Sequence, residues 1–373
     1  MVGEANTWFD RHVTASLRGI GHKVTVFHYG EGVGQYYPRS RRSDRTNKNR
    51  ALLEQARKLK TTEGLNLIFC YVYDDFLLPE TAAALGALGA PMINYNVDMT
   101  NQWYRQIKTA RYFTLMLAAQ RAHMNDLARY GAPVYYFPMA TCAPTFVVNH
   151  TVKIPTPVTF VGTPMLHRIA VFNALIDAGI PLAIYGKFWT EGLLASPDRS
   201  LEKTLDDVVA YGFARLRAEG MGSLWRALAS RLSGDEPSRK QKGIDPSLLK
   251  GFLPEAEVPV VFRDSKINIG FTRMIGDDPN RPGITQIKLR DFEVPANGGF
   301  YLVEHVPEYA DFFVPGKEVE TWRTVNELID KIRYYLSHEG ERVAIAAAGQ
   351  RRACRDHLWM HRFSDLFAKL GLG

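Results

Sequence analysis

The sequence predicts an α/β protein of two domains, each built around a parallel β-sheet, and three observations lead to this prediction. The chain has 373 residues, which suits two or three domains of about 100–200 residues each. Short apolar segments alternate with helical patterns, as in sheets whose parallel strands are joined by crossover helices. A proline-containing segment, residues 155–157, divides this alternation, which then begins again.

The first half contains short apolar or β-branched segments separated by segments with helical periodicity. Residues 65–73 (LNLIFCYVY) are nearly all apolar, which indicates a strand buried on both faces. We assign residues 1–150 to an N-terminal Rossmann-like domain. The expected strands are residues 23–28, 65–73, 91–95, 112–115 and 134–137, and the expected helices are residues 7–17, 47–59, 79–88 and 118–130.

The first strand of this domain is a special case. Residues 1–4 (MVGE) resemble the end of a strand and its turn, although the first strand of a doubly wound sheet usually lies in its interior. An interior strand of so few residues leaves backbone groups of its neighbours unpaired. We therefore expect either a true start upstream or an unusually short strand. A first strand at the sheet edge would contradict this reasoning.

The second half repeats the alternation with one polar interruption. Thr163 is a good helix N-cap and Pro164 suits the first helical position. The expected strands are residues 158–161, 181–185, 266–271 and 299–303, and the expected helices are residues 163–178, 285–294, 325–336 and 342–370.

These elements define the remaining domains. We assign residues 151–350 to a second Rossmann-like domain, with a helical insertion at about 190–250. Residues 351–373 are expected to form a terminal helix that returns to the first domain. Two such domains facing a cleft provide the usual kind of ligand site.

Composition excludes several classes of protein. With 46% hydrophobic and 23% charged residues, the chain is neither disordered nor collagen-like. It has no apolar run of about 18 residues and no secretory leader pattern. Three distant cysteines argue for reduced thiols and against a disulfide framework or a zinc site: Cys70, Cys142 and Cys354. We expect a cytoplasmic location, with peripheral contact at the inner face of the membrane as the alternative.

The basic residues have a local concentration within a formal net charge of +7. Nine basic residues lie between Arg39 and Lys60, against Asp44 and Glu54. We interpret them as a solvated helix face, and an acidic acceptor or anionic membrane surface is the alternative. No context of a nucleic-acid-binding motif accompanies them, so nucleic acid is not an expected partner.

The insertion contains an apolar helix face. Its four members are Leu224, Trp225, Leu228 and Leu232. We interpret this face as packing against the domain. A homodimer contact and an interfacial membrane helix are the alternatives.

The most informative segment is GITQIKLRDFEVPANGGF, residues 283–300. On a helix, one face carries Thr285, Leu289, Phe292, Glu293 and Ala296. Glu293 is then a carboxylate in an apolar stripe, which is costly if it has no partner. Pro295 is expected to end this helix, so the charge also opposes the helix dipole by roughly 0.3–1 kcal/mol. These two penalties favour a functional role, binding sugar hydroxyls, over an ion pair with Arg290 or Lys288.

An ordered series of segments carries a resemblance. INIGFTR, IKLRDFEVPANGGFYL, FFVPGKEVETW, ELIDKIRYYL, ERVAIAAAGQRR and HLWMHRF, within residues 267–363, resemble the C-terminal domain of CgeB-like glycosyltransferases, a family named for a spore-maturation protein. FVGTPMLHR (160–168) and IYGKFW (184–189) resemble the start of that domain. GEANTWFDRHV (3–13) is similar to the opening of family members. The resemblance covers most of the chain outside about 190–250.

This resemblance implies the GT-B fold, in which the second of two Rossmann-like domains holds a nucleoside-diphosphate sugar. It implies no metal bound by a DxD motif and no cofactor. Glu293 is implied to contact the ribose or sugar of the donor, and Arg290 and Lys288 its phosphates. Related retaining enzymes have a second glutamate about two turns earlier, where this chain has Thr285. Retention at the anomeric carbon is therefore not implied.

Other residues suit the chemistry of such a transfer. The leaving nucleoside diphosphate develops negative charge, which cations and helix N-termini stabilise when no metal does. We expect a phosphate clamp of Arg168, in the helix after Gly162, with Arg273 and Lys288. Tyr185 and Gly186 end a strand, where a base could stack or a backbone could approach closely.

An inverting transfer also needs a general base beside the acceptor hydroxyl. Asp98, after an expected strand end, is the first candidate, and Glu4 and His12 are the others. Helix capping or surface ion pairing is the alternative for each. The adjacent pairs Asp74–Asp75 and Asp277–Asp278 are not DxD motifs.

The sequence therefore predicts a metal-independent glycosyltransferase. It would move a sugar from a nucleoside-diphosphate sugar to a hydroxyl of a glycan, lipid-linked sugar, protein or small molecule. A non-catalytic scaffold or binding protein of the same fold and a sugar-nucleotide epimerase are the alternatives. The base and sugar of the donor stay open.

Overall fold

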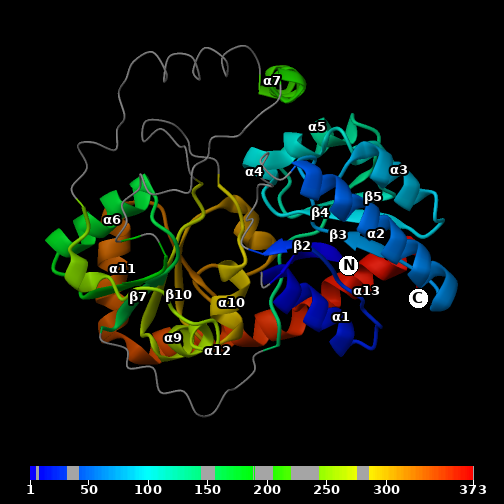
Figure 1. Ribbon diagram of the computed structural model, residues 1–373. Coiled ribbons are helices and arrows are strands. Elements are labelled where there is room, and N and C mark those ends of the chain that lie inside the picture. Colours follow the sequence, from blue (N-terminus) through cyan, green and yellow to red (C-terminus); the bar gives the residue numbers. More distant parts are fainter. Residues whose placement is uncertain are drawn as a thin grey trace. The chain divides into compact units, whose positions relative to one another are not determined.

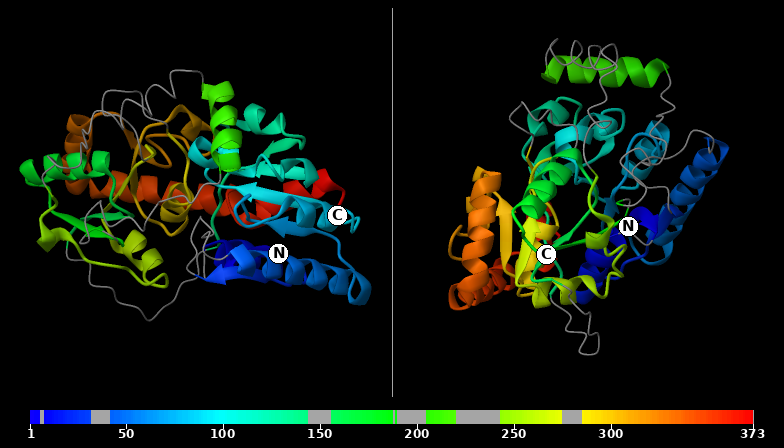
Figure 2. Two further views of the ribbon diagram at one scale, coloured as in Figure 1. Left: turned by 45° about the horizontal axis from the view of Figure 1, so that its top comes forward. Right: turned by 90° about the vertical axis from the view of Figure 1, so that its left-hand side faces the viewer.

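The computed structural model describes residues 1–5, 8–31, 42–143, 156–187, 189, 205–219, 243–274 and 285–372. The chain forms two compact units, each with one parallel sheet and covering helices (Figure 1, Figure 2). Unit 1 comprises Met1–Pro138, Ser200–Gly234 and Trp359–Gly373, and unit 2 comprises Met139–Arg199 and Asp235–Leu358. The predicted α/β class with two Rossmann-like units is confirmed.

The sheet of unit 1 has six parallel strands in the order β2-β1-β3-β4-β5-β6. β1 lies inside the sheet, as expected for a first strand. It is short, and only Val2 pairs with β3, opposite Cys70. The strands are β1 (Val2–Ala5), β2 (Phe27–Glu31), β3 (Ile68–Cys70), β4 (Met92–Asn96), β5 (Leu115–Ala118) and β6 (Val134–Tyr136).

Both faces of this sheet are buried. Successive residues of a strand point to opposite sides, and all three residues of β3 are buried. Ile68 and Cys70 belong to the core beneath α2 and α3. Phe69, between them, contacts Phe9 and Phe363 on the opposite face. This arrangement explains the nearly continuous apolar run in the sequence.

α2 and α3 lie on one face of this sheet, and α13 lies on the other (Figure 1). The π-helical turn Phe9–Thr14 leads into α1 (Ala15–Gly19). The others are α2 (Arg42–Thr62), α3 (Pro79–Gly86), α4 (Met99–Gln102), α5 (Met124–Ala128), α7 (Leu205–Glu219) and α13 (Trp359–Leu370), with 3-10 helices at Trp103–Gln106 and Ala110–Tyr112.

The sheet of unit 2 has five parallel strands in the order β11-β10-β9-β7-β8. The strands are β7 (Val158–Val161), β8 (Leu182–Tyr185), β9 (Ile267–Gly270), β10 (Tyr301–Glu304) and β11 (Glu320–Trp322). The helices are α6 (Leu166–Asp177), α9 (Val258–Asp264), α10 (Arg290–Ala296), α11 (Val325–Ser337) and α12 (Glu339–Asp356), with 3-10 helices at Pro246–Leu248 and Pro307–Asp311. α6 and α11 share a core with the sheet, and α10 packs against α9 and α12.

Several helix boundaries differ from those expected, and three of them bear on the site or the domain boundary. α6 begins at Leu166 with Met165 as its N-cap, so Thr163 and Pro164 precede the helix. α10 begins at Arg290 and continues through Pro295. The expected terminal helix is divided into α12 and α13, because the carbonyl oxygen of His357 accepts a hydrogen bond from Thr141 N (3.1 Å) instead of continuing the helix.

The segments that join the units also differ from expectation. Unit 1 ends at Pro138 rather than near residue 150, and Ser200–Gly234, expected in the second domain, groups with unit 1. There, Tyr211 of α7 packs on Tyr104. α13 belongs to unit 1, so the chain does return to it. The apolar residues 224–232 and the acidic pair 277–278 lie outside the described residues.

Within the described residues, no helix is both long and apolar enough to span a bilayer.

Candidate functional site

The carboxyl ends of the strands of unit 2 bring most of the expected donor-binding residues to one edge. Gly162 follows β7, Gly186 follows β8, and Arg273 comes shortly after β9. The parallel strands all end at this edge, where the following helices begin and where open α/β sheets bind ligands. Glu304, at the end of β10, was not predicted.

Arg168 is a buried cation at this edge. Arg168 is only 6% exposed, and its Nη1 donates a hydrogen bond to the carbonyl oxygen of Thr163 (2.8 Å). The guanidinium lies over the rings of Phe160 and Phe271. Its Nε is buried without a hydrogen-bond partner, and burial lowers its pKa to about 10. Arg168 therefore carries a poorly solvated charge with an unused donor.

His167 lies next to Arg168 and near two other cations. Its Nε2 is buried without a partner, and its pKa falls to about 3, first through burial and then through the charges of Arg168, Lys288 and Arg273. The structure therefore brings the three residues of the expected phosphate clamp near one imidazole. His167 was not singled out in the sequence, although it directly precedes Arg168.

The other two cations of the clamp are held in place by acceptors. Arg273 donates from its backbone N and from Nε to Glu304 (3.0 and 3.1 Å). Lys288 Nζ donates to the carbonyl oxygens of Phe271 and Arg273 (3.0 Å each). Both side chains are thus oriented before any ligand binds.

Two glycines pack closely beside Arg168. A Cβ atom on Gly186 (φ +150°) would overlap the carbonyl oxygen of Gly162. A Cβ atom on Gly162 would lie 2.6 Å from the ring of Phe160 and 3.4 Å from Arg168 Nη1. Only glycine fits either position, because neighbouring protein atoms fill the space that a Cβ atom would take.

The exposed aromatic ring at this edge belongs to Phe252 and not to Tyr185, the residue expected to stack on a base. Tyr185 is 5% exposed, so its ring has little free face for a base. Phe252 is 60% exposed, and its segment pairs with the end of β8, where Gly186 N donates to the carbonyl oxygen of Gly251 (2.9 Å). Lys187 Nζ lies 4.5 Å from the centre of the Phe252 ring.

Glu293 lies in the first turn of α10, contrary to expectation. The helix begins later than predicted, so the helix dipole does not oppose this carboxylate. Glu293 is 8% exposed and forms an ion pair with Arg290 Nη1. The ion pair with Arg290, which was the alternative to a functional role, therefore exists. Glu293 is a buried carboxylate whose charge is compensated.

Asp291 is a site residue that the sequence reasoning missed. It is 1% exposed and accepts hydrogen bonds from Lys288 N and from the hydroxyls of Tyr301 and Tyr309. It therefore fixes the backbone at the entry to α10, next to the clamp. The signal in the sequence was an acidic residue three positions after Lys288 at a helix start.

Burial raises the pKa of Asp291 from 3.8 to about 6, so folding favours its protonated form. The corresponding stability is present below about pH 4 and is lost as the pH rises through 6, roughly 3 kcal/mol in all. Relative to Asp291→Asn, wild type should lose about this much unfolding free energy between pH 4 and 7.5 in urea titrations. Parallel pH profiles of the two proteins would contradict this assignment.

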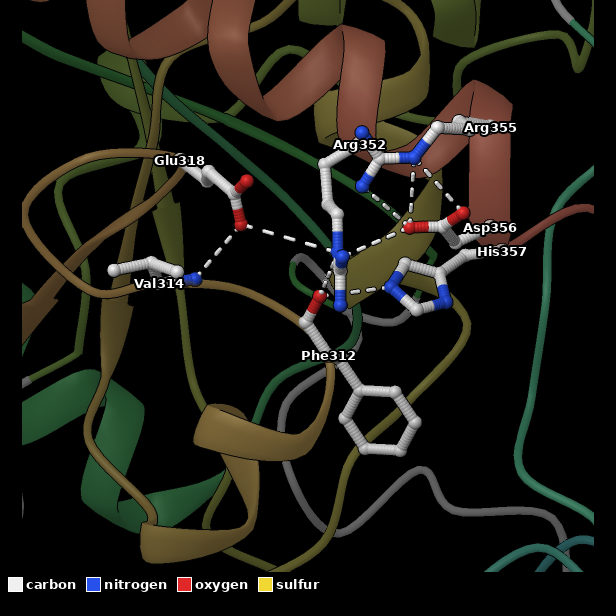
Figure 3. Close-up of polar contacts among 7 residues, drawn as sticks. All are labelled: Phe312, Val314, Glu318, Arg352, Arg355, Asp356 and His357. Atoms are coloured by element: carbon white, nitrogen blue, oxygen red, sulfur yellow. Dashed lines mark hydrogen bonds and ion pairs between the residues drawn. The ribbon is translucent and has the colours of Figure 1, made fainter.

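The segment after β10 is fixed to the end of α12 (Figure 3). Arg352 Nε and His357 Nε2 both donate to the carbonyl oxygen of Phe312 (2.9 and 2.8 Å), and Arg352 pairs with Asp356 (2.9 Å). The ring of Phe312 packs edge-on against Phe292 of α10. Phe312 therefore links α10 to the carboxyl end of α12.

The three candidate bases lie in unit 1. Asp98 follows β4 as the N-cap of α4, and its carboxylate accepts a hydrogen bond from Gln102 Nε2 (3.3 Å). His12 is half-buried in the π-helical turn. Glu4 lies in β1, and its side chain is outside what the structure describes.

Comparison with known proteins adds a fold and a match of part of the chain to a family model. Residues 213–368 match the family model described as "Glycosyl transferase-like". No curated protein sequence matches the chain.

The structure is similar to three solved proteins over nearly its whole length. They are sucrose-phosphate synthase from Thermosynechococcus elongatus (13% identity, TM-score 0.53, 99% of this chain and 94% of that one), Anabaena HepE in complex with UDP (10%, 0.51, 99% and 98%), and a glycosyltransferase from Rickettsia africae (10%, 0.52, 100% and 97%). At these identities the similarity establishes the fold. The chain therefore has the GT-B fold of glycosyltransferases, and its residues 213–368 match the glycosyl transferase-like family.

Proposed function

We propose that the chain is a CgeB-like glycosyltransferase that moves a sugar from a nucleoside-diphosphate sugar to an acceptor hydroxyl. The observation that carries the proposal is the group of three cations around Phe271. Arg168 lies over its ring, and Lys288 Nζ donates to its carbonyl oxygen and to that of Arg273. Buried Arg168 has an unused donor. A diphosphate offers the acceptor oxygen that Arg168 Nε lacks, and its negative charge suits a group of three cations. The family match and the UDP named in the HepE structure agree with such a ligand.

The diphosphate lies between Arg168, Arg273 and Lys288, which surround Phe271. As the glycosidic bond to the phosphate breaks, the departing oxygen gains charge that these prearranged cations stabilise. This part of the reaction requires no metal. Glu293 accepts hydrogen bonds from hydroxyls of the donor's ribose or sugar, with Arg290 as its ion-pair partner.

Phe252 and Lys187 extend this site to the nucleobase. The exposed ring lies in the segment joined to Gly186, so a base can stack on it while the diphosphate occupies the clamp. The dipeptide Tyr185–Gly186 then contributes its backbone, and the buried Tyr185 ring packs in the core beside β8.

A thermal-shift panel of UDP, GDP, ADP, CMP and TDP, each with and without magnesium, tests the proposal. One nucleotide at about 100 times its dissociation constant should stabilise the protein by roughly 2.7 kcal/mol, equally with and without magnesium. Phe252→Ala should weaken the same nucleotide by about 1–3 kcal/mol, the range for a lost base stack. A uniform lack of any shift would contradict the proposal and favour a non-catalytic scaffold.

The matching nucleotide sugars then separate transfer from the remaining alternatives. Wild type should release nucleoside diphosphate from the matching sugar nucleotide. Conversion of that sugar nucleotide into its epimer, without release of diphosphate, would identify an epimerase instead.

A further inference from the structure

His167 has a buried ring nitrogen for which the protein supplies no partner. It is the second residue of α6 and directly precedes Arg168. His167 Nε2 and Arg168 Nε are both buried without a hydrogen-bond partner. A buried polar atom left without a partner costs about 1–3 kcal/mol. Two such atoms on successive residues therefore point to a ligand that satisfies both.

The ring of His167 lies against Phe271, the residue around which the three cations gather. The two ring centres are 5.9 Å apart, and the planes meet at 66°, so the contact is edge-on. The guanidinium of Arg168 lies 5.5 Å from the centre of the same Phe271 ring, and Lys288 Nζ donates to the carbonyl oxygen of Phe271. His167 is therefore part of the group that we assign to the diphosphate, and all of its members belong to unit 2.

Both residues lie in the first turn of α6, a helix of 12 residues. Its N-cap, Met165, makes no side-chain hydrogen bond to that turn. The first backbone N–H groups of a helix favour anions, and helical side chains tilt toward the N-terminus. An anion at this end of α6 thus meets the side chains of His167 and Arg168 as well as the backbone.

The charges around His167 keep its imidazole neutral in the free protein. Burial and then the charges of Arg168, Lys288 and Arg273 lower its pKa to about 3. Glu304, at the end of β10, is engaged by Arg273 and so offsets that charge in part. A fourth positive charge here would be repelled by the other three. A neutral imidazole avoids this repulsion and still offers one N–H group.

We propose that neutral His167 donates a hydrogen bond from Nε2 to a phosphate oxygen of the donor, beside the hydrogen bond from Arg168 Nε. This inference rests on the proposed function and adds a fourth diphosphate ligand to the same site. An ionised phosphate oxygen accepts hydrogen bonds and donates none. The ring must therefore carry its proton on Nε2, with Nδ1 unprotonated.

The first experiment observes the ring directly, without turnover. Protein labelled with ¹⁵N in its histidines is examined at pH 7, and the His167 signals are assigned by their loss in His167→Gln. The nucleoside diphosphate selected by the thermal-shift panel should shift these signals and leave a neutral ring protonated on Nε2. The corresponding nucleoside, which lacks phosphate, is the control and should leave them unchanged.

Three results of this experiment would overturn the inference. One is a ring whose signals do not respond to the nucleoside diphosphate, as expected if a buried water molecule satisfies Nε2. Another is a complex in which Nε2 is unprotonated or both nitrogens are protonated. The third is an equal response to the nucleoside, which would place the base rather than the diphosphate at His167.

The second experiment compares two neutral variants by calorimetric titration with the same nucleoside diphosphate. The amide nitrogen of His167→Gln reaches about as far as Nε2 of histidine, whereas the shorter side chain of His167→Asn reaches only as far as Nδ1. His167→Asn should raise Kd by roughly 10- to 150-fold, the range for a lost hydrogen bond to a charged group. His167→Gln should restore most of the affinity. Equal Kd values for the two variants would overturn the inference, and urea titrations show whether a change in stability accounts for them.

The pH dependence of these Kd values provides a third readout. Dividing the Kd of His167→Asn by that of wild type cancels the ionisation of the ligand itself. The quotient should stay constant between pH 5.5 and 8, because a neutral imidazole donates throughout. A quotient that falls as the pH rises would show that the ring binds in its charged form, contrary to the inference.

Failure of the proposed function gives a different result. If wild type binds none of the nucleotides in the panel, then the proposed function falls and the inference falls with it. If wild type binds one of them and Arg168→Met weakens that binding while His167→Asn does not, then the diphosphate site stands and only the role of His167 is wrong.

Discussion

Arg168→Met is expected to weaken nucleotide binding strongly while leaving the free protein at least as stable as wild type. The lowered pKa of Arg168, about 10, means that burial disfavours its charge by roughly 3 kcal/mol. Replacing a buried ion by a hydrophobic side chain of similar volume is often neutral or stabilising. The lost stacking on Phe160 and Phe271 offsets part of this gain.

The loss of binding has a different origin. Removing one partner of a buried, charge-assisted contact costs about 2–5 kcal/mol, a roughly 30- to 4,000-fold rise in Kd. Calorimetric titration of Arg168→Met with the nucleotide selected by the thermal-shift panel measures this rise, and urea titration measures stability.

Arg342→Met is the matched control. Arg342 is equally buried in unit 2, where Nη1 donates to the carbonyl oxygen of Tyr335 (2.7 Å), away from the clamp. It should leave Kd unchanged. If Arg168→Met binds nucleotide as wild type does, or if both variants lose binding together with stability, then Arg168 has only a structural role.

The strands and the grouping of the three cations could be predicted because their signals are local. Apolar runs such as residues 65–73 indicate strands that are buried on both faces of the sheet. Arg168, Arg273 and Lys288 follow strand ends or precede a helix, and the parallel topology then brings them to one edge. The acceptor carboxylate of Arg273 could not be predicted, because Glu304 comes from a different strand.

The start of α10 depends on contacts distant in the sequence. Residues 285–289 continue the helical periodicity of the apolar residues, so the sequence extended the helix to Thr285. In the structure, Gln286 N donates to the carbonyl oxygen of Thr272 (2.9 Å), and Thr285 bridges to Arg273. These contacts hold the segment extended, and they change Glu293 from a residue near a helix end to one in its first turn.

The division between α12 and α13 has a similar cause. No glycine or proline marks residues 357 and 358, and the interruption arises from pairing with Thr141, more than two hundred positions earlier.

Glu293→Gln is expected to lower kcat/KM for the sugar nucleotide by about 10- to 150-fold. This range corresponds to the roughly 1.5–3 kcal/mol of a hydrogen bond to a charged group. The amide keeps the shape of the side chain and one acceptor oxygen for Arg290. The protein should therefore stay folded, and the Kd of the nucleoside diphosphate alone should change little if Glu293 contacts the sugar.

The ion pair with Arg290 provides the test of a purely structural role. The side chain of Arg290 is 38% exposed, so the pair itself contributes at most about 1 kcal/mol. If Glu293 serves only as its partner, then Arg290→Gln and Glu293→Gln should reduce turnover equally, and the double variant should be no worse than either. If Glu293 binds the donor, then Glu293→Gln alone carries the large loss, and Arg290→Gln adds a smaller one. Kinetics of the four proteins, with urea titrations beside them, distinguish these outcomes, because stability and turnover change together in the first case and separately in the second.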